Sequence, residues 1–148
     1  MERNKKIVGI TCSTFDLLHA GHIIMLEECK KYCDYLICAL QVDPSADRPE
    51  KNTPVQSLVE RYIQLDAVGY VDKIIPYNNE KELETIFATL DLDVRILGEE
   101  YKDKKFTGKD ICQKRGIKLV YNKRDHDFST TNLRERIYKQ ESNKRFVK

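Results

Sequence analysis

Two histidines, His19 and His22, lie three residues apart with Gly21 between them, and residues of these types at this spacing can bind phosphate. They follow the apolar run 6–12, which predicts a strand, and they begin a helical pattern. Residues three apart on a helix share a face, because one turn takes about 3.6 residues. Both rings can therefore reach one ligand. A helix start also presents free N–H groups and a positive dipole end, which favour phosphate, and Gly21 leaves room close to the backbone. The alternative is an ordinary helix start, but the chain has 3 histidines and places two of them here.

A run of hydroxyl side chains near the other end of the chain, Ser129-Thr130-Thr131, is the second candidate for phosphate binding. Hydroxyls at a helix start either cap the helix or, with the free N–H groups, bind phosphate oxygens. Asn132 and Glu135 could complete a capping box without any ligand. The histidine pair at another helix start favours phosphate binding, provided that both groups face one cleft.

Short apolar runs alternate with helical patterns along the chain. The expected strands are 5–12, 35–42, 71–75, 94–97 and 117–121. The expected helices are 20–31, 53–69 with Thr53-Pro54 at its start, 80–90, 109–114, and a last one that begins near Ser129. This order predicts an α/β fold, a Rossmann-like five-stranded parallel sheet with helices on both faces.

Ligands of such sheets bind beyond the carboxyl ends of the strands. The segments that follow a strand here are the turn with His19 and His22, the loop with Arg48 and Lys51, the loop at 98–100, and residues 124–131. We expect them to face a single cleft. Neither the three-glycine dinucleotide fingerprint nor the Gly-rich loop with Lys is present, so phosphate must be held in another way.

Length and composition set the remaining bounds. A chain of 148 residues with 41% hydrophobic content suits one domain, 1–148, with a basic, frayed tail from about 142. The net charge of +2 argues against nucleic acid as a partner. No apolar run approaches a membrane span and no secretory signal is evident, so we expect no membrane partner and a cytoplasmic location. The 5 cysteines contain no Cys-x-x-Cys pair, which favours reduced, packed thiols.

The motifs resemble one family over about residues 6–138. Thr14-Phe15-Asp16 with His19-Ala20-Gly21-His22, then Arg61 and the segment 70–76, and finally Arg124 with Ser129-Thr130-Thr131, resemble the small bacterial cytidylyltransferases of the HxGH nucleotidyltransferase superfamily. The glycerol-3-phosphate-using members are the most similar. The resemblance implies that the phosphate of an alcohol monoester attacks the α-phosphate of CTP, giving a CDP-alcohol such as CDP-glycerol, and pyrophosphate.

The resemblance also implies residue roles. His19 and His22 would hold the triphosphate and stabilise charge on the α-phosphate, helped by Lys51 (with Arg48 as its competitor) and by Arg124. The other residues implied to contact the nucleotide are Thr14, Phe15, Gly21, Glu99, Ser129 and Thr130. Asp16 and Arg61 would bind the acceptor. No direct metal motif is present; Mg²⁺ would arrive with the triphosphate, with Asp16 as a possible contact. A homodimer is expected, with 70–72 as the contact.

Some residues depart from the family pattern and keep alternatives open. Asp125-His126-Asp127-Phe128 replaces the usual Thr-x-Gly-Ile, and Gly69 stands where the glycerol-phosphate enzyme has Arg. We interpret His126 as a surface histidine. The rival functions are a cytidylyltransferase for another phosphorylated polyol or amino alcohol in cell-surface polysaccharide synthesis, an ATP-dependent adenylyltransferase, and a nucleotide-binding regulator without turnover.

Overall fold

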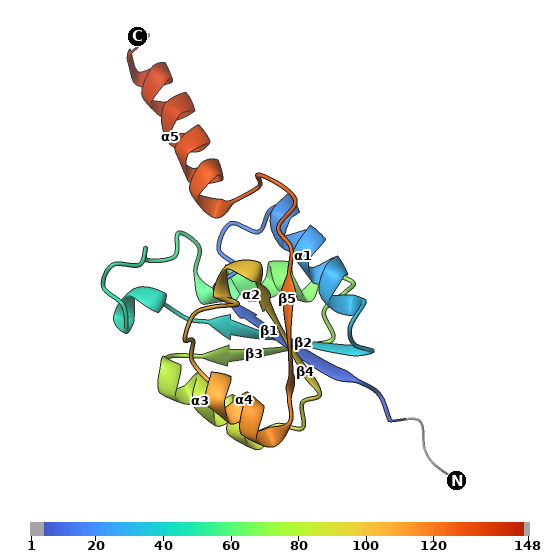
Figure 1. Ribbon diagram of the computed structural model, residues 1–148. Helices are drawn as coiled ribbons and strands as arrows, with labels where there is room; N and C mark the ends of the chain where they lie inside the picture. Colours follow the sequence, from blue (N-terminus) through green and yellow to red (C-terminus); the bar gives the residue numbers. More distant parts are fainter. Residues whose placement is uncertain (1–4, 147–148) are drawn as a thin grey trace.

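A five-stranded, fully parallel sheet forms the centre of the protein (Figure 1). The computed structural model describes residues 5–146. The strands are β1 (Val8–Ser13), β2 (Tyr35–Gln41), β3 (Lys73–Tyr77), β4 (Val94–Gly98) and β5 (Lys118–Asn122). Their spatial order is β3-β2-β1-β4-β5, and every neighbouring pair is parallel. The predicted Rossmann-like α/β architecture is confirmed.

Four of the five helices cover the two faces of this sheet, and the last projects away from it (Figure 1). The helices are α1 (Ala20–Lys30), α2 (Leu58–Asp66), α3 (Glu80–Thr89), α4 (Lys109–Arg115) and α5 (Thr130–Phe146), with short 3-10 turns η1 (Pro44–Ala46) and η2 (Glu99–Tyr101). Leu26 of α1 and Leu65 of α2 pack into one core cluster. Phe87 of α3 and Cys112 of α4 belong to the cluster on the other face. The direction in which successive strands are added to the sheet reverses between β1 and β4. Parallel sheets of this kind bind ligands at such a point.

Several boundaries differ from those expected, and three of the differences change how an element begins or ends. The expected helix start at Thr53-Pro54 is wrong: α2 begins at Leu58, because Ser57 and Glu60 form a reciprocal capping box. Strand β3 does not stop at Pro76 but runs through it, which an edge strand tolerates because its outer N–H positions are unpaired. Helix α5 continues to Phe146, past residue 142, where we expected fraying; residues 147–148 lie outside the described residues.

The cysteines fill the cores, as their spacing predicted. All five are free, and four of them, Cys29, Cys33, Cys38 and Cys112, are buried. Burial raises the pKa of Cys29 to about 12 and that of Cys12 to about 11, so both are neutral thiols. Between residues 5 and 146 there is no helix with the length and apolar character needed to cross a bilayer.

Candidate active site

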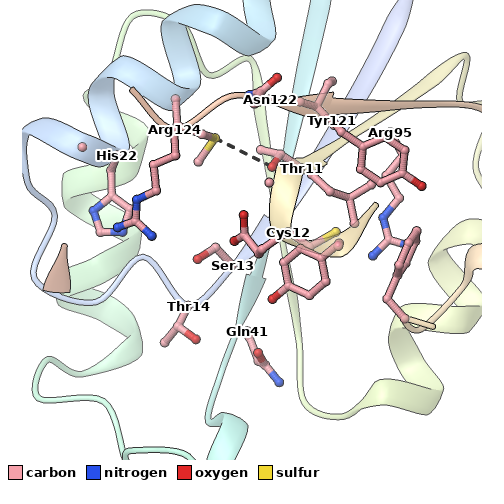
Figure 2. A pocket seen from close by; sticks show the side chains of 18 of the residues that line it. Thr11, Cys12, Ser13, Thr14, His22, Gln41, Arg95, Tyr121, Asn122 and Arg124 are labelled. Carbon is pink, nitrogen blue, oxygen red and sulfur yellow. Dashed lines mark hydrogen bonds between the residues drawn. The ribbon is translucent and has the colours of Figure 1, made fainter. Parts of the chain in front are cut away.

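A cleft of about 1010 Å³ opens at the carboxyl ends of the central strands (Figure 2). Its walls come from the ends of β1, β4 and β5, the start of α1, the loop after β2 and the start of α5. The sequence-predicted residues that line it are Thr14, His19, Gly21, His22, Lys51, Arg124 and Thr130. Segments more than a hundred residues apart therefore meet at one cavity, as the position of the polar loops predicted.

His19 joins the first helix to the last one. It is the N-cap of α1, and its Nδ1 atom accepts the backbone N–H of Gly21 at 3.0 Å. A neutral imidazole carries one proton, so Nε2 is then the donor, and it lies 3.2 Å from Oγ1 of Thr130. The imidazole pair and the hydroxyl cluster thus lie around one space.

The side chain of His22 completes the capping box at the start of α1. Its Nδ1 atom accepts the backbone N–H of His19 at 3.1 Å, and the two ring centroids are 4.0 Å apart. Burial, then the positive charges of His19 and Arg124, lower the pKa of His22 to about 3, against an opposing effect of Asp16. Burial, then Arg124 and His126, also lower the pKa of His19. Both rings are therefore neutral Nε2–H donors at neutral pH, a form suited to phosphate oxygens.

His126 adds a third imidazole to this group. It was interpreted as a surface histidine, but it is half-buried and lines the cleft. Its Nδ1 atom accepts the backbone N–H of Phe128 at 3.1 Å, which leaves Nε2 as the donor here too. A Cβ added at Gly21 would lie 2.8 Å from Cε1 of His19 and 2.9 Å from Cε1 of His126. A side chain at position 21 would therefore clash with both rings, so glycine is needed there. The sequence alone did not reveal that His126 lies beside Gly21.

The turn before α1 has an uncommon backbone. Phe15 and Leu17 both have φ of 51°, in the left-handed region that side chains seldom adopt. The ring of Phe15 is buried in the core, and the N–H of Leu17 donates to Oε1 of Gln56 at 2.8 Å. Thr14 lines the cleft, whereas Phe15, also expected to contact the nucleotide, does not.

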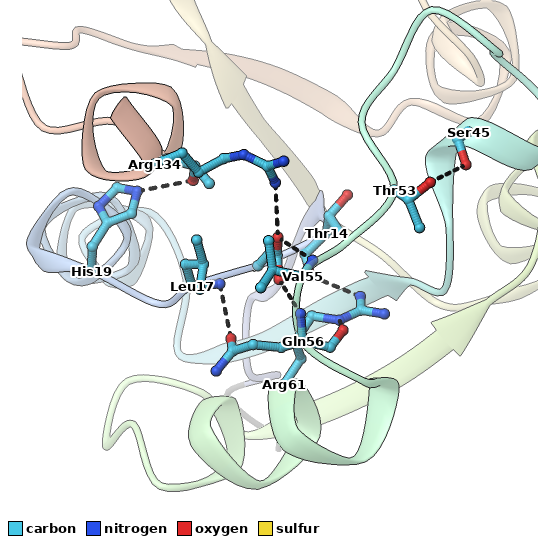
Figure 3. Close-up of polar contacts among 11 residues, drawn as sticks. Thr14, Leu17, His19, Ser45, Thr53, Val55, Gln56, Arg61 and Arg134 are labelled. Atoms are coloured by element: carbon cyan, nitrogen blue, oxygen red, sulfur yellow. Dashed lines mark hydrogen bonds and ion pairs between the residues drawn. The ribbon is translucent and has the colours of Figure 1, made fainter. Parts of the chain in front are cut away.

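Asp16 and Arg61, the candidate acceptor ligands, do not line the cleft. Both hold loops beside it, and Figure 3 shows Arg61 next to Thr14 and Gln56. The two carboxylate oxygens of Asp16 accept the N–H groups of Val55 and Gln56 at 2.8 and 2.9 Å. Arg61 is 2% exposed and donates to backbone carbonyls. Its acceptors are the oxygens of Thr14, Gln41, Val42 and Gln56. With these groups engaged, the structure does not bring either residue to the substrate.

For two of the residues expected to contact the nucleotide, the next residue in the chain lines the cleft instead. Ser129 accepts the N–H of Asn132 at 3.0 Å and so caps α5, while Thr130 lines the cleft. Glu99 does not line the cleft, whereas Glu100 does. Arg124 lines it and donates to the carbonyl of Phe128 at 2.8 Å, which shapes the loop that carries His126.

Arg95 was not among the candidates from the sequence. It lies in β4, is 5% exposed, and lines the cleft. The available signal was an arginine within an otherwise apolar strand, Val94-Arg95-Ile96-Leu97. Charged residues are rarely fully buried without a partner, so an arginine in a buried strand indicates a specific partner or role.

Fold and site together define a nucleotidyltransferase-type α/β protein, with a histidine pair at the first helix and a hydroxyl at the last. A family model described as cytidylyltransferase-like matches residues 10–136, and the chain belongs to this family. The expected family is confirmed, and with it the expected enzyme class at the level of the family.

Relatives and one solved structure agree with this family. The chain is 34% identical to a glycerol-3-phosphate cytidylyltransferase of Bacillus subtilis (strain 168) over 128 residues, 86% of this chain and 95% of that protein. It is 37% identical over 131 residues to the bifunctional protein HldE of Paramagnetospirillum magneticum, covering 88% of this chain but 27% of that protein. A crystal structure of a lipopolysaccharide core biosynthesis protein from Thermoplasma volcanium GSS1 has a TM-score of 0.64 and 25% identity, covering 84% of this chain and 100% of that one.

Proposed function

We propose that the chain transfers CMP from CTP to a phosphorylated alcohol, with glycerol 3-phosphate as the first candidate acceptor. An oxygen of the acceptor phosphate attacks the α-phosphorus of CTP, the bond between that phosphorus and the bridging oxygen to the β-phosphate breaks, and pyrophosphate leaves. With glycerol 3-phosphate the product is CDP-glycerol. The observation that carries this proposal is the contact between His19 and Thr130, which puts donors from both ends of the chain around one space.

The residues of the cleft suit this reaction through position and charge. His19 and His22 offer neutral Nε2–H groups, each oriented by a backbone N–H at Nδ1. Such fixed donors stabilise negative charge that develops in transfer without needing to reorganise. Arg124 and Lys51 add positive charge to the same cleft. The acceptor phosphate is ionised at neutral pH, so no side chain has to act as a general base.

The side chains that the structure describes do not form a metal site of their own. Within the described part of the chain, no three His, Cys, Asp or Glu side chains are grouped so that they could hold an ion. Asp16, the candidate contact, uses both oxygens on backbone N–H groups. We therefore propose that Mg²⁺ binds as a counter-ion of the triphosphate rather than through Asp16.

The proposal includes a cytoplasmic homodimer that contacts through residues 70–72, and a role in making cell-surface polysaccharide precursors. Tyr70 donates to Glu27 at 3.0 Å, and Asp72 accepts the N–H of Leu36 at 2.8 Å and pairs with Lys30. These contacts fix the segment on the surface of its own chain. Light scattering of the purified protein, with Tyr70→Glu as the variant, tests the dimer.

A panel of substrates tests the reaction. Pyrophosphate release is measured with CTP, ATP, GTP and UTP, each against glycerol 3-phosphate, ribitol 5-phosphate and phosphoethanolamine. We expect release with CTP and a polyol phosphate, and a loss of several orders of magnitude in His19→Ala. Release with ATP in place of CTP would support an adenylyltransferase. If nothing is turned over but CTP binds in calorimetry, the chain is a nucleotide-binding regulator.

A further inference from the structure

The guanidinium of Arg95 is a buried cation at one end of the cleft. The residue is 5% exposed, and its central carbon lies 4.1 Å from the ring centroid of Phe87 and 4.8 Å from that of Phe106. One of its nitrogens donates to the carbonyl of Thr107 at 2.5 Å. Two aromatic rings and one carbonyl thus hold the group in place, although a guanidinium has five N–H donors.

No carboxylate balances this charge among the side chains that the structure describes. Arg95 has no ion-pair partner within 4.0 Å there. Glu80, which lines the same cleft, pairs instead with Arg48 at 3.4 Å and accepts from Gln41 at 3.4 Å. A buried charge is costly unless it is paired, so an anion from outside the chain would satisfy Arg95.

Other donors that line the same cleft as Arg95 can also bind an anion. Tyr77 is 3% exposed and lines the cleft, and burial raises its pKa, so its hydroxyl stays protonated as a donor. Lys105 lines the cleft as well. The guanidinium of Arg95, the hydroxyl of Tyr77 and the ammonium of Lys105 are all hydrogen-bond donors, and two of them are cations. Donors of these kinds bind carboxylates and phosphates.

This position is separate from the histidine site. Arg95 stacks on Phe87, which belongs to the core under α3 and α4, whereas α1 packs its Leu26 on the opposite face of the sheet. In Figure 2, His22 and Arg124 lie at one end of the cleft and Arg95 at the other. We therefore treat the anion at Arg95 as a different group from the phosphate that reacts beside His22.

From these contacts we infer that Arg95 binds a second anionic group of the acceptor, remote from the phosphate that attacks CTP. The inference rests on the proposed function and narrows its substrate class. The preferred acceptor is a phosphate monoester that also carries a carboxylate or a second phosphate, rather than a neutral polyol phosphate. Arg95 then selects the acceptor and has no part in breaking the CTP bond.

Three esters with the same carbon chain test this inference. They are glycerol 3-phosphate, 3-phosphoglycerate and glycerol 1,3-bisphosphate, and pyrophosphate release from CTP is measured for the wild type, Arg95→Gln and Arg95→Lys. We expect at least one doubly anionic ester to exceed glycerol 3-phosphate about tenfold or more in kcat/KM, mainly through KM. Arg95→Gln should remove this preference and leave kcat/KM for glycerol 3-phosphate within about threefold.

Arg115→Gln is the matched control, because Arg115 also ties helices together, donating to the carbonyls of Phe87 and Leu90 at 2.6 and 2.8 Å, but does not line the cleft. It should keep the preference. Circular dichroism and thermal unfolding show whether each variant folds. Arg95→Lys keeps the charge and should retain part of the preference, so it tests the inference even if Arg95→Gln does not fold. A wild type that favours glycerol 3-phosphate, or an equal loss for all esters in Arg95→Gln, would overturn the inference.

Absence of turnover would count against the proposed function and is separated from this inference by binding. Calorimetry with 3-phosphoglycerate and with glycerol 1,3-bisphosphate, at saturating CTP, is then run on the wild type and on Arg95→Gln. Binding that is lost in the variant supports the Arg95 subsite even without catalysis. Equal binding in both proteins, or none in either, rejects it.

Discussion

Nε2 of His19 and Oγ1 of Thr130 lie 3.2 Å apart although 111 residues separate them in the chain. The contact joins the N-terminus of α1 to that of α5, so the positive dipole ends of two helices face the same space. Oriented donors and two positive dipole ends together can hold several phosphate groups at once.

Replacing Thr130 by Val should reduce catalysis with little effect on the fold. The methyl group keeps the shape of the side chain but removes the oxygen that accepts from His19 and that could contact phosphate. We expect kcat/KM for CTP to fall about tenfold or more, from loss of one or two polar contacts. Thr131→Val is the control, because Thr131 is exposed and does not line the cleft. Equal rates for both variants would show that the hydroxyl at 130 serves only the helix.

The pH dependence of stability should report on His22. Its pKa is about 3 in the folded chain and near 6.5 when unfolded, so between these values the unfolded state binds more protons. The free energy of unfolding therefore falls as the pH is lowered from about 6.5 towards 3, by up to about 1.4 kcal/mol per pH unit. Urea unfolding at several pH values, in the wild type and in His22→Asn, measures this slope. His19 titrates in both proteins, so the difference isolates His22, and identical slopes would contradict the pKa assignment.

Adding one methyl group at Gly21 should disturb the site more than the helix. Alanine favours a helix over glycine by about 1 kcal/mol, but its Cβ would lie under 3 Å from the rings of His19 and His126. We expect Gly21→Ala to fold and to lose about tenfold or more in kcat, because His19 must move away from Thr130. Gly69→Ala is the matched control, since nothing lies within 4 Å of its added Cβ. Unchanged turnover in Gly21→Ala would mean that the position of His19 does not limit the reaction.

Asp16→Asn separates a structural role from an acceptor-binding role. The carboxylate accepts two backbone N–H groups, from Val55 and Gln56, and an amide can replace only one of its oxygens. We expect a loss of about 1–3 kcal/mol in the free energy of unfolding, with a larger change in stability than in KM for the acceptor. Chemical denaturation and initial rates on the same preparations test this. A raised acceptor KM at unchanged stability would restore the substrate role implied by the family resemblance.

The sequence alone predicted the order of strands and helices, because buried parallel strands and amphipathic helices have distinct apolar patterns. It also predicted that His19 and Thr130 share a cleft, since both follow strands of one sheet. It could not predict the partners of Asp16 and Arg61, which bind backbone atoms up to 47 residues away in the chain, as Arg61 does with the carbonyl of Thr14. The same limit hid Arg95, whose environment comes from α3 and from the loop before α4.

The sequence also could not predict which of two adjacent, chemically similar residues lines the cleft. Ser129 and Thr130 both bear hydroxyls at a helix start, and only the path of the chain decides which one caps and which one faces the cleft. His126 was interpreted as a surface histidine, yet its loop folds back on α1 beside Gly21.

Pro76 in β3 affects how copies of this protein can associate. Strand β3 is one of the two edge strands of the sheet, and proline there removes an amide that an incoming strand would need. Pairing of a strand from another molecule with this edge is therefore disfavoured at Pro76. The dimer contact proposed at residues 70–72 lies just before this strand, so substitutions of side chains there can test it without changing the strand pairing.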